Sequence, residues 1–179
     1  LCTHTHRDHS PLAQALKAAT GAQLLGHGVT PGDGRQDETF VPDRALVDGD
    51  VVDCGAFRLR AVHTPGHASN HLCYLLEESG LLFTGDHVMQ GSTVVISPPD
   101  GDMQAYLDSL QRLPGLPVKR FAPGHGHVIE TPREEVRRLV AHRLKREEKI
   151  HAALAAHGPG TLEMLVRHAY DDVPERIHP

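Results

Sequence analysis

The alternation of apolar and polar residues predicts short strands in the middle of the chain. In VVDCGAFRLRAVH, residues 51–63, apolar side chains alternate with arginines after Gly55, which predicts a hairpin turned at that glycine. The stretch HLCYLLEESGLLFTGD, residues 71–86, predicts a second pair of strands joined by a turn. Further strands are predicted at three shorter apolar runs, which are residues 1–3, 22–27 and 118–122.

Two longer segments have the apolar spacing of helices. After Asp102, apolar residues recur at helical intervals as far as Leu113, which predicts one amphipathic helix. Residues 131–134 have a capping-box pattern with Pro132 at the first helical position. We expect this second helix to be long and to stop near residues 158–159, where Gly is followed by Pro.

Two short helices are predicted near the ends of the sequence. Residues 10–20 favour a helix capped by Ser10, with Pro11 in its first turn and Gly21 just beyond its end. Another helix is expected to begin at Thr161.

Composition adds to this picture. The 179 residues fit one domain, or one domain with a small appendage. Hydrophobic residues make up 39% of the chain, but aromatic residues only 4%, so the core must be aliphatic and packed in layers. Residues 29–50 are rich in Gly, Pro and Asp and predict a long loop that could form the rim of a site. No apolar run is long enough for a membrane span.

The charge pattern argues against a general nucleic-acid-binding surface. The net charge is −5, so a basic surface is excluded except as a local patch. Residues 133–149 hold such a patch, with seven Lys or Arg against four Glu, and a solvated outer face explains it as well as a nucleic-acid contact does. The three cysteines lie far apart, which argues against a disulfide framework and favours a cytoplasmic location.

Histidine is the outlier in the composition. The chain has 15 histidines, and a share this high suggests metal binding. The segment LCTHTHRDHS places His4, His6, Asp8 and His9 within six positions. His4 and His6 are two residues apart, so on an extended chain they point the same way and can bind one ion, whereas Asp8 and His9 follow a turn and can face a second ion.

Three more stretches each place a possible ligand just after an apolar strand. The turn in AVHTPGHASNH presents His67, the strand end in LLFTGDH presents Asp86, and the turn in RFAPGHGHV presents His125. With the first segment they supply five histidines and two aspartates, which exceeds what one tetrahedral ion needs. Two ions that share one ligand fit the count, and the two oxygens of Asp86 suit it for the shared position.

These motifs, in this order, resemble the metallo-β-lactamase superfamily. The residues that carry the resemblance are THTHRDH, TPGHASNH, TGD and PGHG. The resemblance implies an α/β (α+β) fold, a four-layer αββα sandwich with two zinc ions at one edge of its sheets. It assigns one zinc to His4, His6 and His67 and the other to Asp8, His9 and His125, with Asp86 between them. Asp8 would also orient the attacking water.

Outside the ligands, the sequence resembles the branch of this family that contains β-lactamase-like protein 2. The resemblance implies that residues 1–157 are the metallo-β-lactamase-like domain, with its N-terminal strands missing. Residues 158–179 would begin a small winged-helix-like tail. The roles of His71, His87 and His127 stay open: His71 and His87 as contacts behind the ligands or as packing, and His127 as a contact, a proton donor or an exposed bystander.

Three functions are compatible with this reading. The favoured one is a dinuclear zinc hydrolase in which a metal-bound hydroxide attacks a small ester-like or thioester-like substrate. The resemblance to β-lactamase-like protein 2 also implies single-stranded RNA cleavage, which the weak electrostatic footprint and the scattered aromatic residues disfavour. A non-catalytic scaffold or nucleic-acid-binding protein with a structural metal is the third, although a structural zinc needs only four ligands. The sequence leaves the oligomeric state open.

Overall fold

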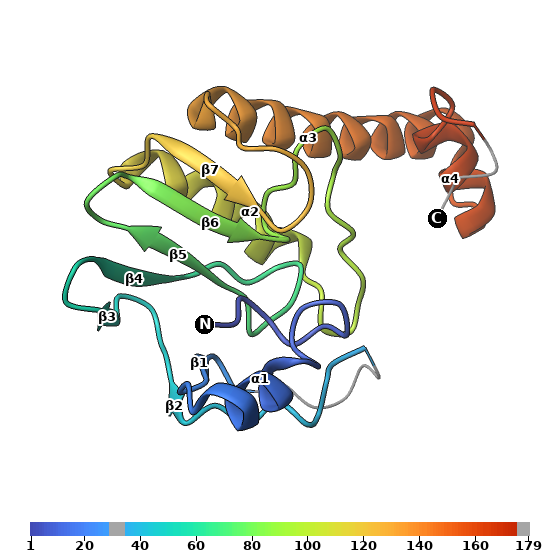
Figure 1. Cartoon of the computed structure of the whole chain (residues 1–179). Coiled ribbons are helices and arrows are strands. Elements are labelled where there is room, and N and C mark those ends of the chain that lie inside the picture. The colour runs from blue at the N-terminus through green and yellow to red at the C-terminus, as the bar shows by residue number, and fades with distance from the viewer. Residues whose placement is uncertain (29–34, 175–179) are drawn as a thin grey trace. The chain divides into compact units, whose positions relative to one another are not determined.

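The chain contains two compact units. The computed structural model describes residues 1–28 and 35–174, so residues 29–34 of the predicted loop and 175–179 of the predicted tail lie outside the described residues. The units are Leu1–Val136 and Arg137–Pro179. Every strand found in the described residues belongs to the first unit (Figure 1).

A five-stranded sheet forms the centre of the first unit. Its strands are β3 (Val51–Asp53), β4 (Arg58–His63), β5 (Leu72–Leu76), β6 (Leu81–Gly85) and β7 (Arg120–Pro123). They lie in the order β3-β4-β5-β6-β7, antiparallel except for the parallel pair β6 and β7. The two predicted hairpins and the predicted strand at 118–122 are therefore confirmed.

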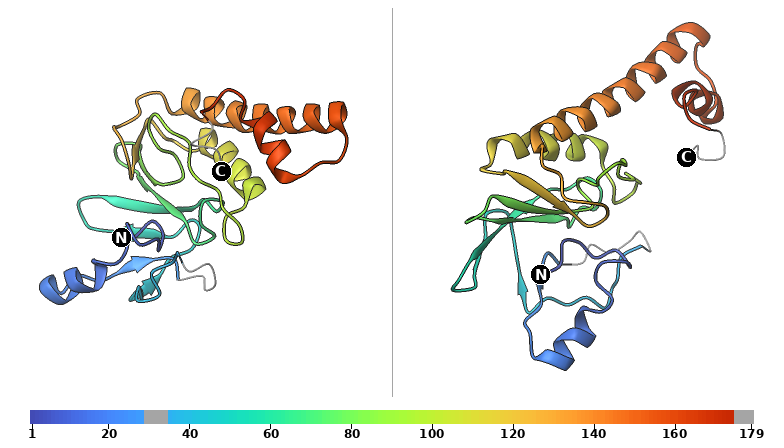
Figure 2. Two further views of the ribbon diagram at one scale, coloured as in Figure 1. Left: turned by 90° about the vertical axis from the view of Figure 1, so that its right-hand side faces the viewer. Right: turned by 45° about the horizontal axis from the view of Figure 1, so that its top comes forward.

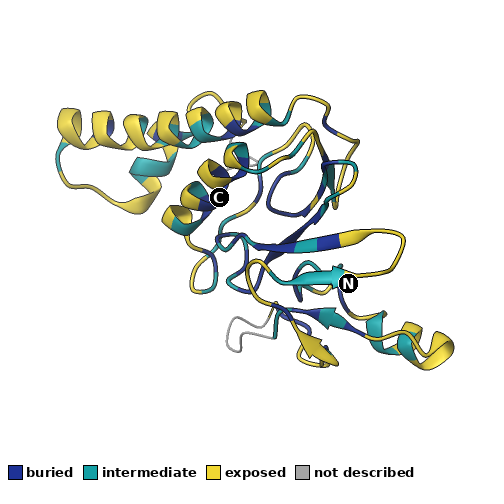
Figure 3. Ribbon diagram, turned by 90° about the vertical axis from the view of Figure 1, so that its left-hand side faces the viewer, coloured by how far each residue is buried: buried dark blue, intermediate teal, exposed yellow. Residues whose placement is uncertain are grey.

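One face of this sheet carries an aliphatic core. In the register of β4 and β5, Leu59 pairs with Leu76, and Ala61 with Tyr74. Every second residue points to the same face of a strand, so Leu72 joins this face as well. The buried cluster of Leu46, Leu59, Ala61, Leu72 and Tyr74 confirms the prediction of a largely aliphatic core. Figure 3 shows β5 as almost entirely buried.

A second, smaller sheet lies on that side of the five-stranded sheet. It consists of the parallel strands β1 (Leu25–Gly26) and β2 (Arg44–Ala45). Helix α1 (Ala13–Thr20) lies beyond it, and Ala13 packs against the buried cluster of Cys2, Leu24 and Phe40. The strand β2 falls inside residues 29–50, so the prediction of a long loop with turns was wrong at these two residues.

Helix α2 (Met103–Arg112) covers the other face of the five-stranded sheet (Figure 2). This helix after Asp102 was predicted, and the side chain of Asp102 accepts a hydrogen bond from the Ala105 N–H and caps it. A short 3-10 turn, η1 (Leu113–Gly115), follows. Helix, large sheet, small sheet and helix thus form the layers αββα within this unit.

Two details near the N-terminus differ from prediction. Residues 1–3 form no strand, although the Cys2 N–H donates to the Leu25 carbonyl and the Leu72 N–H donates to the Thr3 carbonyl. Ser10 does not cap α1, which begins at Ala13. The Ser10 hydroxyl instead donates to the carboxylate of Asp37, so a tertiary contact replaces the local cap.

The second unit is helical. Helix α3 (Pro132–His157) crosses the boundary between the units, and α4 (Leu162–Ala169) follows with Thr161 as its cap, as predicted. Ion pairs between Arg146 and Asp172 and between Lys149 and Asp171 join α3 to the segment after α4. Most of α3 is exposed in Figure 3. Among the described residues, no helix combines the length and the apolar character needed to cross a membrane. All three cysteines are free.

Candidate metal centre

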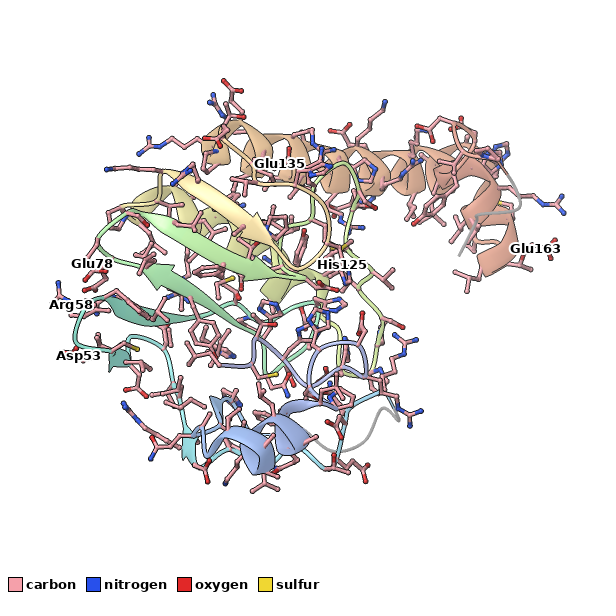
Figure 4. The ribbon with its side chains drawn as sticks, viewed as in Figure 1. Asp53, Arg58, Glu78, His125, Glu135 and Glu163 are labelled. Carbon is pink, nitrogen blue, oxygen red and sulfur yellow. The ribbon has the colours of Figure 1, made fainter. Side chains whose placement is uncertain are left out.

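All seven predicted ligands converge at one edge of the five-stranded sheet. The segment 4–9 precedes α1, His67 lies between β4 and β5, Asp86 directly follows β6, and His125 follows β7. Figure 4 labels His125 beyond the ends of β6 and β7. Strand ends are rigid while the loops beyond them are exposed, so ligands mounted there converge without full burial.

Pairing with a distant loop fixes the first motif. His6 forms an isolated antiparallel bridge with Gln36, and the Asp37 N–H donates to the Thr5 carbonyl at 2.6 Å. Segment 4–9 therefore has its own backbone partner, although it belongs to no named strand. The predicted rim loop does lie beside the site at residues 36–37.

His4, His6 and His67 form one group of possible ligands. One nitrogen from each ring lies within 4.8 Å of the others. His6 Nδ1 and His67 Nε2 are 3.0 Å apart, and His4 Nε2 is buried without a hydrogen-bond partner among the described residues. The Val95 carbonyl lies 2.7 Å from His67 Nδ1 and can only accept, so this nitrogen carries the proton and leaves Nε2 free to bind.

Asp8, His9, Asp86 and His125 form a second group under the same 4.8 Å criterion. Asp8 Oδ2 lies 3.5 Å from His9 Nε2 and 3.4 Å from His125 Nε2. The side chains of Asp8 and His125 are 63% and 53% exposed, whereas that of His9 is only 13% exposed. This second group is therefore open to solvent on the side of Asp8 and His125.

Asp86 stands between the two groups. Its Oδ1 lies 3.4 Å from His9 Nε2 and 3.6 Å from His125 Nε2. Its Oδ2 lies 3.8 Å from His67 Nε2, in the other group. The two oxygens thus face different groups, which is the arrangement that a bridging carboxylate requires.

The electrostatics keep His4 and Asp86 in the forms that bind metals. Burial, and then the neighbouring histidines, lower the pKa of His4 far below its ordinary value. Burial opposes ionisation of Asp86, but the close contact with His9 and its charge outweigh burial and lower the Asp86 pKa. Burial lowers the pKa of His9, but its contact with Asp86 outweighs burial and raises it. The site therefore holds a neutral His4 and an ionised Asp86.

Two glycines of the motifs are required by close approach. A Cβ on Gly124 would lie 2.9 Å from Asp86 Oδ1. A Cβ on Gly85, which has φ +48°, would lie 2.8 Å from His71 Nε2. The glycines in the Pro-Gly-His and Gly-Asp turns therefore let the backbone pass directly beside the ligand groups.

The structure gives environments to the three histidines whose roles the sequence left open. His71 is fully buried, and its Nε2 lies 3.2 Å from the Asp86 backbone nitrogen. His87 is fully buried against Tyr106, and neither ring nitrogen has a hydrogen-bond partner among the described residues. His127 is exposed.

Sequence reasoning missed the groups that hold the ligands from behind. The Val95 carbonyl orients His67, and a backbone group leaves no signal in the residue types. Asp100 accepts hydrogen bonds from the Ser69 backbone and hydroxyl and from the Gln36 side chain. It therefore joins the loop after His67 to the rim loop, and its separation of 31 and 64 positions from these partners hides the contact.

The chain is similar in sequence to known proteins. The chain is 35% identical over 158 residues to the thioesterase pkgB of Emericella nidulans. This match covers 88% of the present chain and 42% of pkgB. It is 28% identical over 190 residues to the beta-lactamase-like protein 2 homolog of Drosophila melanogaster, with 100% and 62% covered. The chain thus spans roughly half the length of these curated relatives.

A solved structure has the same fold. It is a metallo-beta-lactamase family protein from Thermus thermophilus, with a TM-score of 0.64, 28% identity, and 90% of this chain and 54% of that one covered. The family model described as "Metallo-beta-lactamase superfamily" matches residues 1–125, which contain all seven candidate ligands. The chain belongs to the metallo-beta-lactamase superfamily.

Proposed function

We propose that this protein is a dinuclear zinc hydrolase that cleaves a small ester-like or thioester-like substrate. The observation that carries the proposal is the placement of Asp86, with one oxygen toward each ligand group. His4, His6 and His67 would hold one ion, and Asp8, His9 and His125 the other. Bound zinc would lower the pKa of a water molecule and polarise the carbonyl of the substrate.

The donor set favours zinc. All seven groups are imidazoles or carboxylates, and no thiol takes part, which suits a borderline cation. His67 is held in the tautomer that leaves Nε2 free, and the buried His4 Nε2 lacks another partner among the described residues. A buried nitrogen of this kind is costly unless a ligand satisfies it.

Asp8 is the candidate catalytic residue. Its carboxylate is the most exposed of the second group and lies against both His9 and His125. An exposed carboxylate at this position can accept a hydrogen bond from a water molecule and orient it toward a substrate entering from solvent. We therefore assign Asp8 both a binding role and an orienting role.

The metal content is the first test. Protein purified without added metal, then exchanged into zinc and freed of excess, should hold about two equivalents per chain because the site offers two ligand groups. Elemental analysis measures this directly, and His67→Ala should retain about one. A reproducible single equivalent in the unmodified protein would contradict the dinuclear assignment.

The substrate class rests on two arguments. The Emericella nidulans relative is named a thioesterase. The net charge of −5 gives little attraction for a polyanion, although the locally basic segment 133–149 keeps RNA as the competing substrate. A cytoplasmic location is part of the same proposal, because three free cysteines suit a reducing compartment.

A substrate panel separates these alternatives. Zinc-loaded protein should hydrolyse acyl thioesters of different chain lengths, and it should leave a labelled single-stranded RNA intact. Asp86→Ala should lose the thioesterase activity, which excludes a contaminant. RNA cleavage that disappears in Asp86→Ala, with every thioester untouched, would replace the substrate assignment while keeping the metal site. No turnover of either, with full zinc occupancy, would favour a non-catalytic protein.

A further inference from the structure

A line of buried side chains leads from the Asp86 backbone into the core of the large sheet. His71, Thr64 and Cys73 are 0%, 1% and 0% exposed. The Asp86 nitrogen lies 3.2 Å from His71 Nε2, and His71 Nδ1 lies 2.9 Å from the Thr64 hydroxyl. That hydroxyl lies 3.2 Å from Cys73 Sγ, which in turn lies 3.7 Å from the Thr84 carbonyl.

The direction of the hydrogen bonds can be read from the end at Asp86. A backbone N–H can only donate, so Nε2 of His71 must accept with its lone pair. A neutral imidazole then carries its proton on Nδ1, which donates to the Thr64 hydroxyl. From this end the ring is in the Nδ1–H form.

The same direction follows independently from the end at Thr84. Its carbonyl can only accept, so the Cys73 thiol donates its single hydrogen there. The Thr64 hydroxyl must then donate to Cys73 Sγ, and its oxygen is left to accept from His71 Nδ1. Both ends require the same tautomer, so the whole line is satisfied in one direction.

The ring of His71 also lies against the ligand groups themselves. Its centroid is 5.0 Å from that of His4 and 6.5 Å from that of His67. The absence of a side chain at Gly85 is what admits the ring beside the Asp86 backbone. His71 therefore lies close to three candidate ligands, His4, His67 and Asp86. Because it also accepts a hydrogen bond from the Asp86 backbone, it can determine the position of the Asp86 carboxylate.

We propose that His71 is a positioning residue for Asp86. Its Nε2 accepts a hydrogen bond from the Asp86 backbone N–H, and Thr64 and Cys73 hold the ring in the Nδ1–H tautomer. The Asp86 backbone is thereby fixed so that the carboxylate turns one oxygen to each ligand group. The role rests on the proposed function, because it concerns the placement of a bridging ligand. It also explains why a buried histidine occupies this position rather than an aliphatic residue: it satisfies the Asp86 N–H, which would otherwise be buried without a partner.

Zinc affinity of matched variants tests the proposal. His71→Leu removes the acceptor at similar volume, and we expect the weaker zinc equivalent to bind about 10- to 100-fold less tightly, as is typical for partners behind metal ligands. His71→Gln keeps a side-chain oxygen near Nε2 and should recover most of the loss. Competition with a chromophoric chelator measures both equivalents without any assay of activity.

The control is Tyr74→Phe. The Tyr74 hydroxyl is also buried on β5 and donates to the Cys2 carbonyl, outside the line from Asp86 to Thr84. Its loss should lower the thermal midpoint and leave both zinc affinities unchanged. If His71→Leu behaves like Tyr74→Phe, with reduced stability but unchanged zinc affinity, the positioning role is wrong. Wild-type protein that takes up no zinc would overturn the proposed function and, with it, the positioning role.

The tautomer of His71 gives a second test, which uses the wild-type protein and so remains valid if a variant fails to fold. Long-range proton–nitrogen correlation spectra of metal-free wild-type protein should show His71 protonated at Nδ1 and unprotonated at Nε2. Thr64→Val removes the hydroxyl at nearly constant volume. It should lower the affinity for the weaker zinc equivalent about tenfold, at the lower end of the range for such partners. A spectrum with the proton on Nε2, or on both nitrogens, would overturn the proposal.

Discussion

Replacing Asp86 with alanine should reduce zinc binding and hydrolysis more than replacing His125 with alanine. His125 faces only the second ligand group, whereas Asp86 faces both. Two dications at the spacing usual for such sites, about 3.5 to 4 Å, repel each other by roughly 4 kcal/mol even in bulk water. In the wild type the shared carboxylate offsets this repulsion. Without it, we expect the second zinc ion to bind about three orders of magnitude more weakly.

Calorimetric zinc titration of the two variants measures the difference, with thioester hydrolysis at saturating zinc as the second readout. His125→Ala is the matched control because it also removes one ligand from the open side of the site. The expected order of residual activity is wild type, His125→Ala, then Asp86→Ala. Equal zinc affinity and equal residual rates in the two variants would mean that Asp86 does not bridge.

The elements that the sequence predicts correctly are those with a local signal. The two hairpins follow from alternation at β3–β6, and α2 follows from apolar spacing behind the cap at Asp102. The end of α3 follows from Gly158, which has φ +73°. In each case the residues that define the element are close together in the sequence, so no tertiary contact was needed to find it.

The errors arise where a distant contact replaces a local one. Ser10 has the right residue type for a cap, but its hydroxyl donates a hydrogen bond to Asp37, 27 positions away. The strand β2 is only two residues long and exists because it pairs with β1, 19 positions earlier. Residue type and spacing carry no information about either partner.

The candidate site divides in the same way. The seven candidate ligands were predictable because each lies in a short motif, and the structure brings their side chains together in two groups. The groups behind them were not predictable. Val95 acts through its backbone carbonyl. The hydrogen bond from the Asp86 N–H to His71 depends on the turn at Gly85 and on the pairing of β5 with β6.

Acid should destabilise the metal-free protein strongly between neutral pH and pH 5. Burial lowers the pKa of His4 and of His71 far below the ordinary 6.5, and it lowers the pKa of His87 to about 3. Below pH 6.5 the unfolded chain therefore binds more protons than the folded chain, so the free energy of unfolding falls as the pH falls. At pH 5 each such histidine costs about 2 kcal/mol, or about 6 kcal/mol for three.

This loss is comparable to the whole stability of a typical domain, so unfolding near pH 5 is the expected result. His9 acts in the opposite direction: its pKa is raised, so its contribution is fully present below 6.5 and is lost as the pH rises through its folded pKa. One residue against three leaves the net sign unchanged. Urea midpoints of the metal-free protein at pH 7.5, 6 and 5 measure the effect.

His87→Leu isolates one share of this loss. Neither ring nitrogen of His87 has a hydrogen-bond partner among the described residues, so the substitution removes a proton-binding group without orphaning another. At pH 7.5 the variant should therefore be at least as stable as wild type, and its midpoint should fall by about one third less on going to pH 5. Identical pH profiles for the two proteins would show that His87 is not held neutral by burial, because only a group whose pKa differs between the folded and unfolded chain contributes to the slope.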